Sequence, residues 1–312
     1  MAEVKISIII ATRHREQILW ETVEKAIEAT GSSNAEIIVI NDGDAPLHIP
    51  GYLLNHISCF DNPKKGASSA RNFGASKAKG EILFFVDDDM WINNEVIDWI
   101  NSYVIEKDHT TSVYYINWEY PPYLKDKLAE TKVGRYLLSA NYHNLWGRLH
   151  KDSPQPASGF YQYDSLGSGS LVLHEKLFNN AGGYNEKMVF QGEDADLAGK
   201  FNDSGVPIFI IFDITLYHNQ SDRLEIDSFL RRISNGFRSE FDAVKSGERN
   251  TISETRYNGF KKRVLEFSRL TERSWILIFN ILPNHSIMTP ICNRLIGALG
   301  GLQRYKQWKN IN

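Results

Sequence analysis

The sequence predicts an α/β fold with a mostly parallel sheet flanked by helices, and three observations support it. Short apolar runs rich in β-branched residues occupy residues 6–10, 37–40 and 82–86. A helical pattern follows each run, and each run ends in polar residues. Such runs are typical of strands buried on both faces, and their alternation with helices implies right-handed parallel crossovers.

One helix is predicted after each of these strands, from apolar spacing and from stop signals. In the first, Trp20, Val23 and Ile27 form one stripe that Gly31 ends. The second covers residues 67–78 and the third residues 93–107. An apolar run further along the chain ends at Leu216.

Polar residues follow each predicted strand at the edge where parallel sheets bind ligands. Thr12 and Arg13 follow the first strand, Asp42 follows the second, and residues 87–89 (three aspartates) follow the third. We therefore expect these side chains to converge.

The amino-acid composition excludes several classes of function for this chain. The chain has 312 residues and a net charge of -3, so no global field selects nucleic acid as a partner. Its two cysteines, Cys59 and Cys292, favour neither a disulfide scaffold nor a zinc-thiolate site, and they fit a reducing compartment. We read no secretory signal and no apolar run long enough to span a membrane.

The triple aspartate allows two interpretations. It is either a solvated turn in which Asp88 or Asp89 caps a helix, or a site for a hard cation. Asp87 and Asp89 share one side of an extended backbone, and Mg²⁺ or Mn²⁺ would bridge such oxygens to a diphosphate. No Walker-type or GxGxxG phosphate loop is present.

A series of motifs resembles the family 2 glycosyltransferases, which have the GT-A fold. The matching residues are, in order, ISIIIATR at 6–13, NDGD at 41–44, ARNFG at 70–74, FFVDDD at 84–89 and GEDADL at 192–197. The resemblance covers about residues 5–218. It implies a GT-A sheet with a helical C-terminal extension, and an enzyme that uses a nucleotide sugar.

The resemblance also implies roles on the donor side. Thr12 and Asp42 would hold the nucleobase and ribose, and Arg71 would lie near the nucleotide, although a surface ion pair is its other interpretation. Asp87 would contact the donor, with Arg13 and Asp88 also on the donor side. Asp89 would bind the divalent metal, Mn²⁺ or Mg²⁺, with His218 as a second ligand or as a purely structural residue.

On the acceptor side, Asp194 is the candidate general base for an inverting transfer, because a carboxylate can deprotonate the attacking hydroxyl. Glu193, Trp118 and Gly169 would lie on the same side. Glu193 and Asp194 are also well placed to cap a helix N-terminus, and both roles are compatible. Aromatic residues at 114–146 favour either sugar stacking or core packing, and residues 142–167 are interpreted as a loop that closes over the acceptor.

Two departures from the family pattern affect the nucleotide site. The first turn, residues 11–15, is strongly basic, so its arginines would meet phosphate or pair with Asp42 or Asp44. Asn41 replaces the first acid of the usual pair, which leaves Asp42 alone there.

We divide the chain into a catalytic domain at residues 1–222, with halves 1–110 and 111–222, and a helical extension at 223–312. Residues 273–312 carry basic and apolar side chains but no acid. They would contact the inner face of the plasma membrane from the cytoplasm, or else pack on the domain or on a second subunit of a homo-oligomer.

The sequence thus indicates a metal-dependent hexosyltransferase for polysaccharide or glycoconjugate synthesis, with a nucleotide-sugar donor (a UDP-sugar) and a saccharide or lipid-linked acceptor. Two alternatives stay open: an inactive carbohydrate-binding or scaffold protein of the same fold, and a metal-dependent nucleotidyltransferase. The sugar, acceptor, linkage and oligomeric state are not specified.

Overall fold

The computed structural model describes residues 4–31, 34–150, 154–188, 192–221, 224–245 and 259–311. The chain forms two compact units. The first, called the sheet unit, comprises Met1–Pro121, Asn144–Val189 and Glu193–Asn219. The second, the helical unit, comprises Pro122–His143, Phe190–Gly192 and Gln220–Asn312.

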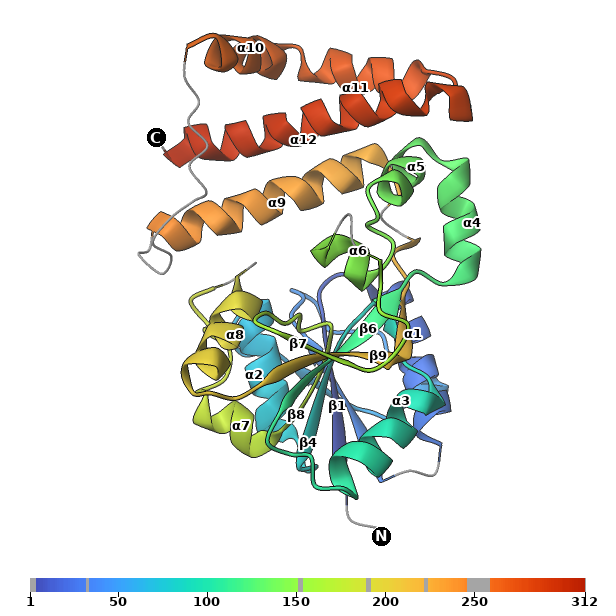
Figure 1. Ribbon diagram of the computed structural model, residues 1–312, viewed down its shortest axis with the longest axis vertical. Coiled ribbons are helices and arrows are strands. Elements are labelled where there is room, and N and C mark those ends of the chain that lie inside the picture. The colour runs from blue at the N-terminus through green and yellow to red at the C-terminus, as the bar shows by residue number, and fades with distance from the viewer. Residues whose placement is uncertain are drawn as a thin grey trace. The chain divides into compact units, whose positions relative to one another are not determined.

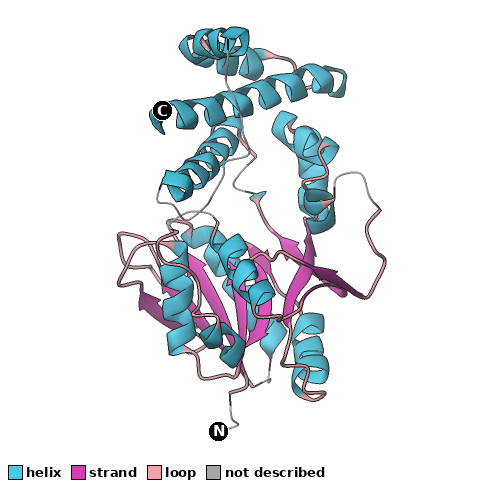
Figure 2. Cartoon of the chain, turned by 60° about the vertical axis from the view of Figure 1, so that its left-hand side comes forward, coloured by secondary structure: helices cyan, strands magenta, loops and turns pink. Residues whose placement is uncertain are grey.

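The sheet unit is built on one sheet with the strand order β3-β2-β1-β4-β8-β6-β9-β5, and β7 pairs with β9 (Figure 2). The pairs β1–β2, β2–β3, β1–β4 and β6–β9 are parallel, whereas β8, β5 and β7 join antiparallel. The strands are β1 Ile6–Thr12, β2 Ala35–Asn41, β3 Ser58–Asp61, β4 Ile82–Asp87, β5 Met90–Trp91, β6 Val113–Glu119, β7 Phe160–Tyr163, β8 Ser170–His174 and β9 Ile208–His218.

Helices cover both faces of this sheet. In Figure 1, α2, α7 and α8 lie on one side and α1 and α3 on the other. Their bounds are α1 Glu16–Thr30, α2 Ala67–Lys77, α3 Asn94–Trp99 continued by the π-helical turn η2 Ile100–Ile105, α6 Leu145–Leu149, α7 Glu175–Asn180 and α8 Glu193–Asp203, with the short 3-10 turn η1 Gly51–Leu53.

The core explains why the apolar runs became central strands. Ile8, Ile10 and Phe85 are fully buried. The Phe85 ring lies 5.1 Å from that of Phe178 on α7 and 5.5 Å from that of Tyr184, so aromatic packing fixes the α7–α8 side on the sheet. The three predicted strands and the helices between them are confirmed.

The prediction of a continuous loop at residues 142–167 is wrong. Helix α6 begins at Leu145, where Asn144 caps it by accepting from the Gly147 amide at 2.6 Å. Strand β7 then pairs with β9. The prolines and glycine that suggested a loop lie between these two short elements, at Pro154, Pro156 and Gly159.

The helical unit consists of α4 Pro122–Glu130, α5 Lys132–Ser139, α9 Ile226–Lys245, α10 Gly259–Leu270, α11 Glu272–Ile281, η4 Ser286–Met288 and α12 Thr289–Ile311. Helix α12 lies between α9 and the α10–α11 pair (Figure 1). Its contacts with α5 group residues 122–143 with the C-terminal helices. The predicted division at residue 222 had placed residues 122–143 with the sheet instead. The roles assigned to the two parts of that division stay predictions.

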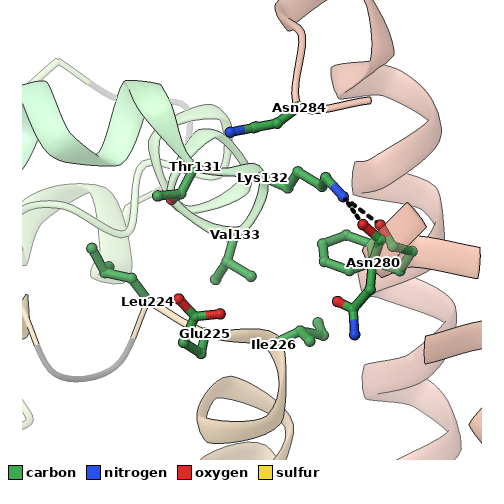
Figure 3. Close-up of a pocket in the computed structure, with 9 residues that line it drawn as sticks. Thr131, Lys132, Val133, Leu224, Glu225, Ile226, Asn280 and Asn284 are labelled. Carbon is green, nitrogen blue, oxygen red and sulfur yellow. Dashed lines mark hydrogen bonds between the residues drawn. The ribbon is translucent and has the colours of Figure 1, made fainter. Parts of the chain in front are cut away.

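A pocket of 290 Å³ lies within the helical unit (Figure 3). The Lys132 ammonium donates to the carbonyls of Phe279 and Asn280 at 2.6 and 2.9 Å, so a cation stabilises the C-terminal end of α11. None of the carboxylates that follow the strands of the sheet unit lines this pocket. Its walls are Thr131, Lys132, Val133, Leu224, Glu225, Ile226, Phe279, Asn280 and Asn284.

None of the helices in the described ranges combines the length and the apolar character of a membrane span.

Candidate functional site at the strand ends

The parallel strands deliver their polar residues to one edge, as predicted. Thr12 on β1 is opposite Asn41 on β2, and Ala11 on β1 is opposite Asp87 on β4. Register therefore places the ends of the three strands side by side. Asp42 begins directly after β2, and its amide donates to the Thr12 carbonyl at 2.8 Å.

Asp42 lies in a preformed polar recess. Its Oδ1 accepts from the Asn62 amide group at 2.7 Å and from the Gly66 backbone N–H at 2.9 Å. Gly66 has φ +130, a conformation that side-chain-bearing residues rarely adopt. Oδ2 faces the Arg13 guanidinium at 3.8 Å, and this is one of the two pairings that the basic turn suggested. The second basic pairing in this turn is His14 with Asp44, at 3.3 Å.

Asp88 and Asp89 are bridged by Arg15, one of the two arginines that were expected to meet phosphate or to pair with Asp42 or Asp44. The guanidinium pairs with Asp88 Oδ1, and its other nitrogen lies 3.0 Å from Asp89 Oδ2. Thr12 donates to Asp88 Oδ2 at 2.7 Å, so the predicted nucleotide residue contacts a carboxylate in this state. Burial raises the pKa of Asp88 to about 7; Arg15 opposes this rise and the charge of Asp89 adds to it.

Arg71 forms a second bridge, between carboxylates that lie far apart in the sequence. Its guanidinium is 2.8 Å from Asp87 Oδ1 and 3.1 Å from Glu193 Oε1. Burial lowers the pKa of Arg71, but Asp87 and Glu193 more than offset that effect, so the pKa lies above its usual value. Arg71 is only 11% exposed, which excludes the surface ion pair considered for it.

Asp194, on the first turn of α8, faces the segment before β8. Its Oδ1 accepts from the Ser168 backbone N–H at 3.2 Å and from the Ser168 hydroxyl. Burial raises the pKa of Asp194 to about 7, and the neighbouring charge of Glu193 adds to this rise, whereas Arg71 and Ser168 oppose it. A general base is most effective when its pKa lies near the working pH, so this carboxylate suits that chemistry.

Gly169 allows the β8 segment to approach the acids closely. A Cβ at this position would lie 2.7 Å from Asp87 Oδ2, and the Asp87 amide donates to the Gly169 carbonyl at 3.2 Å. The predicted acceptor-side glycine therefore packs against the predicted donor-side aspartate. The two sides of the site meet at this point.

His218 is the last residue of β9, and its Nε2 lies 3.1 Å from Asp89 Oδ1. The ring of Trp118 packs edge-on against the imidazole, with centroids 4.7 Å apart. Trp118 is buried, at 3% exposure, so in this state it orients His218 rather than presenting a ring face to solvent.

The donor set of Asp89 and His218 fits a divalent cation. A carboxylate oxygen and an imidazole nitrogen are ligands that Mn²⁺ accepts, and both side chains are buried and already adjacent. No cluster of three or more His, Cys, Asp and Glu side chains suited to a metal occurs within the described residues. Asp89 and His218 would thus supply two of the ligands of such a cation, and the other ligands would have to come from elsewhere.

Residues 7–159 match the family described as Glycosyl transferase family 2. This part of the chain belongs to glycosyl transferase family 2. This match includes the residues from β1 to the triple aspartate that carry the resemblance.

Individual relatives are more distant. Glycosyltransferase GlyG of Streptococcus pneumoniae is 32% identical over 111 residues, which are 33% of this chain and 36% of that protein. The chain spans 15 to 36% of the length of the curated relatives it matches. The similarity to these relatives is thus limited to part of each protein, and the family match lies within residues 7–159 of this chain.

Two solved structures share the GT-A fold at low identity. The mannosyltransferase PcManGT from Pyrobaculum calidifontis, in complex with GDP-Man and Mn²⁺, has a TM-score of 0.55 at 11% identity, covering 99% of this chain and 88% of that one. GalNAc-T7 with UDP, GalNAc and Mn²⁺ has a TM-score of 0.51 at 15% identity, covering 88% and 56%. The predicted fold class is confirmed.

Proposed function

We propose that the chain is a metal-dependent glycosyltransferase that moves a sugar from a nucleotide-sugar donor to an acceptor hydroxyl with inversion. The observation that carries this proposal is the convergence of Asp42, Asp87 and Asp89 at the strand ends. Arg71 links Asp87 to Glu193, the neighbour of Asp194 on α8. This arrangement supplies a nucleoside recess, a cation pair and a base within one site.

In the proposed reaction, Asp42 accepts a hydrogen bond from the imide N–H of uracil, which favours a UDP-sugar. Thr12 and Arg13 border that recess. Asp87 and Asp88 face the donor, and Arg71 holds Asp87 in place. Asp89 and His218 would hold Mn²⁺ or Mg²⁺, which when bound supplies Lewis-acid stabilisation of the leaving diphosphate.

Asp194 takes the proton of the acceptor hydroxyl as that oxygen attacks the anomeric carbon, on the face opposite the diphosphate. Ser168 orients this carboxylate, and Glu193 and Arg71 set its charge environment. Trp118, which packs against His218, and Gly169, which packs against Asp87, shape the acceptor side. The acceptor is proposed to be a saccharide or a lipid-linked saccharide, in polysaccharide or glycoconjugate synthesis. A cytoplasmic location and a homo-oligomer stay predictions.

Thermal stability against a panel of nucleotides and nucleotide sugars tests the donor site, because a ligand that binds the folded state raises the melting temperature. We expect UDP or a UDP-sugar to raise Tm only when Mn²⁺ is present. A protein with no such shift for any nucleotide in the presence of metal would not be a transferase of this kind, and a carbohydrate-binding role would replace it. Release of pyrophosphate from a nucleoside triphosphate would instead support a nucleotidyltransferase.

A further inference from the structure

The α10–α11 pair presents a row of large apolar side chains to solvent. Phe267 and Leu270 on α10 are 64% and 78% exposed, and Leu277 and Ile281 on α11 are 61% and 70% exposed. On α11, residues 275, 278 and 281 recur at a spacing of three, and Leu277 borders the same side. The opposite side of α11 carries Phe279, which is buried. Apolar surface that is gathered in this way marks an interaction site.

The acids of this pair are neutralised by α12. Glu272 is paired with Lys306 at 2.8 Å. Glu266 is paired with Lys309 at 2.6 Å and accepts from the Tyr305 hydroxyl at 2.7 Å. These contacts hold the pKa of Glu266 at about 2. Both carboxylates are therefore committed to contacts with α12.

Basic side chains remain on the exposed surface. Arg263 on α10 and Arg273 on α11 are exposed beside the apolar residues. Residues 259–311 contain nine lysines and arginines against two glutamates, whereas the rest of the chain has 26 basic and 36 acidic residues. The excess of positive charge is thus concentrated in the segment from α10 to α12, to which the exposed apolar row belongs.

This charge distinguishes between occupants. A second copy of the same face would bring like charges together around the apolar contact, which opposes association. An anionic lipid surface offers opposite charge to the arginines and an apolar layer to the leucine, isoleucine and phenylalanine side chains. Helices α10 and α11, of 12 and 10 residues, have the length of interfacial rather than spanning segments.

We propose that the exposed face of α10–α11 docks the protein on an anionic membrane surface. The apolar side chains enter the headgroup boundary and the arginines contact lipid phosphates. This surface is independent of the proposed transferase chemistry, because docking can be measured without donor or acceptor.

The test is flotation of the full chain with phosphatidylcholine vesicles, with and without phosphatidylglycerol. We expect binding to the anionic vesicles, little binding to the neutral ones, and release by salt. Leu277→Glu should lower the partition coefficient about tenfold, because transfer of one leucine side chain into the apolar layer raises that coefficient by about this factor. Arg273→Gln should lower it about fivefold.

Leu54→Glu is the matched control, since Leu54 is a leucine of similar exposure, 58%, in the sheet unit. It should bind vesicles as the unchanged chain does. Equal partitioning into neutral and anionic vesicles, or no partitioning, would overturn the proposal. So would light scattering that shows a dimer which Leu277→Glu converts to monomers, because the face would then be an interface between copies.

Discussion

Arg15 and Arg71 both bridge carboxylates at the strand ends, but they connect the chain differently. Arg15 lies in the turn before α1 and holds two neighbouring aspartates, Asp88 and Asp89. Arg71 lies on α2 and joins Asp87 at the end of β4 to Glu193 on α8. The Arg15 bridge therefore organises the proposed cation side, whereas the Arg71 bridge joins the proposed donor side to the proposed acceptor side.

The partners of Arg71 also determine the surroundings of the Asp194 carboxylate. The Arg71 guanidinium is paired with Asp87 and Glu193, while Asp194 Oδ1 accepts from Ser168 instead. Burial and the charge of the neighbouring Glu193 raise the pKa of Asp194 to about 7. The first turn of α8 thus carries one arginine-bound acid, Glu193, and one adjacent acid, Asp194, which we propose for proton transfer.

The largest effect is expected from Asp194→Asn. Removing the base should lower the turnover number about a thousandfold, because general-base catalysis contributes on the order of 10²–10⁴. Donor affinity should change little, since Asp194 is proposed to act on the acceptor hydroxyl. Initial rates of UDP release and calorimetric titration of the donor measure the two quantities.

Asp196→Asn, two residues along α8, is the matched control. Asp196 pairs with Lys200 of the same helix at 2.9 Å, so its loss should leave turnover within about twofold. Equal losses in the two variants would mean that α8 needs its negative charge for stability and that Asp194 has no special role.

Arg71→Met tests whether the Arg71 bridge holds the site together. The change leaves Asp87 and Glu193 without their cation, and the free energy of unfolding should fall by about 3 kcal/mol. Arg15→Met should cost less, because Asp88 keeps its hydrogen bond from Thr12 and Asp89 keeps its contact with His218. Urea denaturation compares the two variants, and an equal or larger loss for Arg15→Met would contradict the distinction drawn here.

A smaller effect is expected from Asp89→Asn. It weakens the proposed cation pair with His218, so the Mn²⁺-dependent affinity for UDP should fall about a hundredfold. Asp98→Asn on α3 is the control, because Asp98 lies on an exposed helix surface. Unchanged manganese dependence in Asp89→Asn would place the cation elsewhere.

Much of this site could be predicted from the sequence because parallel strands bring their ends together whatever lies between them. Asp42, Asp87 and Asp89 were placed by that rule alone. The interpretation of Arg71 as part of the site came from the motif, and its burial agrees with a role inside the site. The chemical roles of these residues stay predictions.

Arg15 and Ser168 could not be placed in the same way. The partner of Arg15 depends on how the first turn packs against the end of β4, and only the basic character of residues 11–15 signalled a role. Ser168 contacts Asp194 because β8 pairs antiparallel with β4, a long-range pairing that no local period encodes. The grouping of residues 122–143 with the C-terminal helices depends on packing in the same way.

The pH dependence of kcat/KM for sugar transfer tests the role of Asp194 most directly. Because the pKa of Asp194 is raised to about 7 and only the carboxylate accepts a proton, the rate should fall about tenfold per pH unit below that value. Ser168→Ala removes a hydrogen bond that lowers this pKa, so the acid limb should move to higher pH. A rate that stays level down to pH of about 5, or a limb that Ser168→Ala does not move, would contradict the assignment of Asp194 as the base.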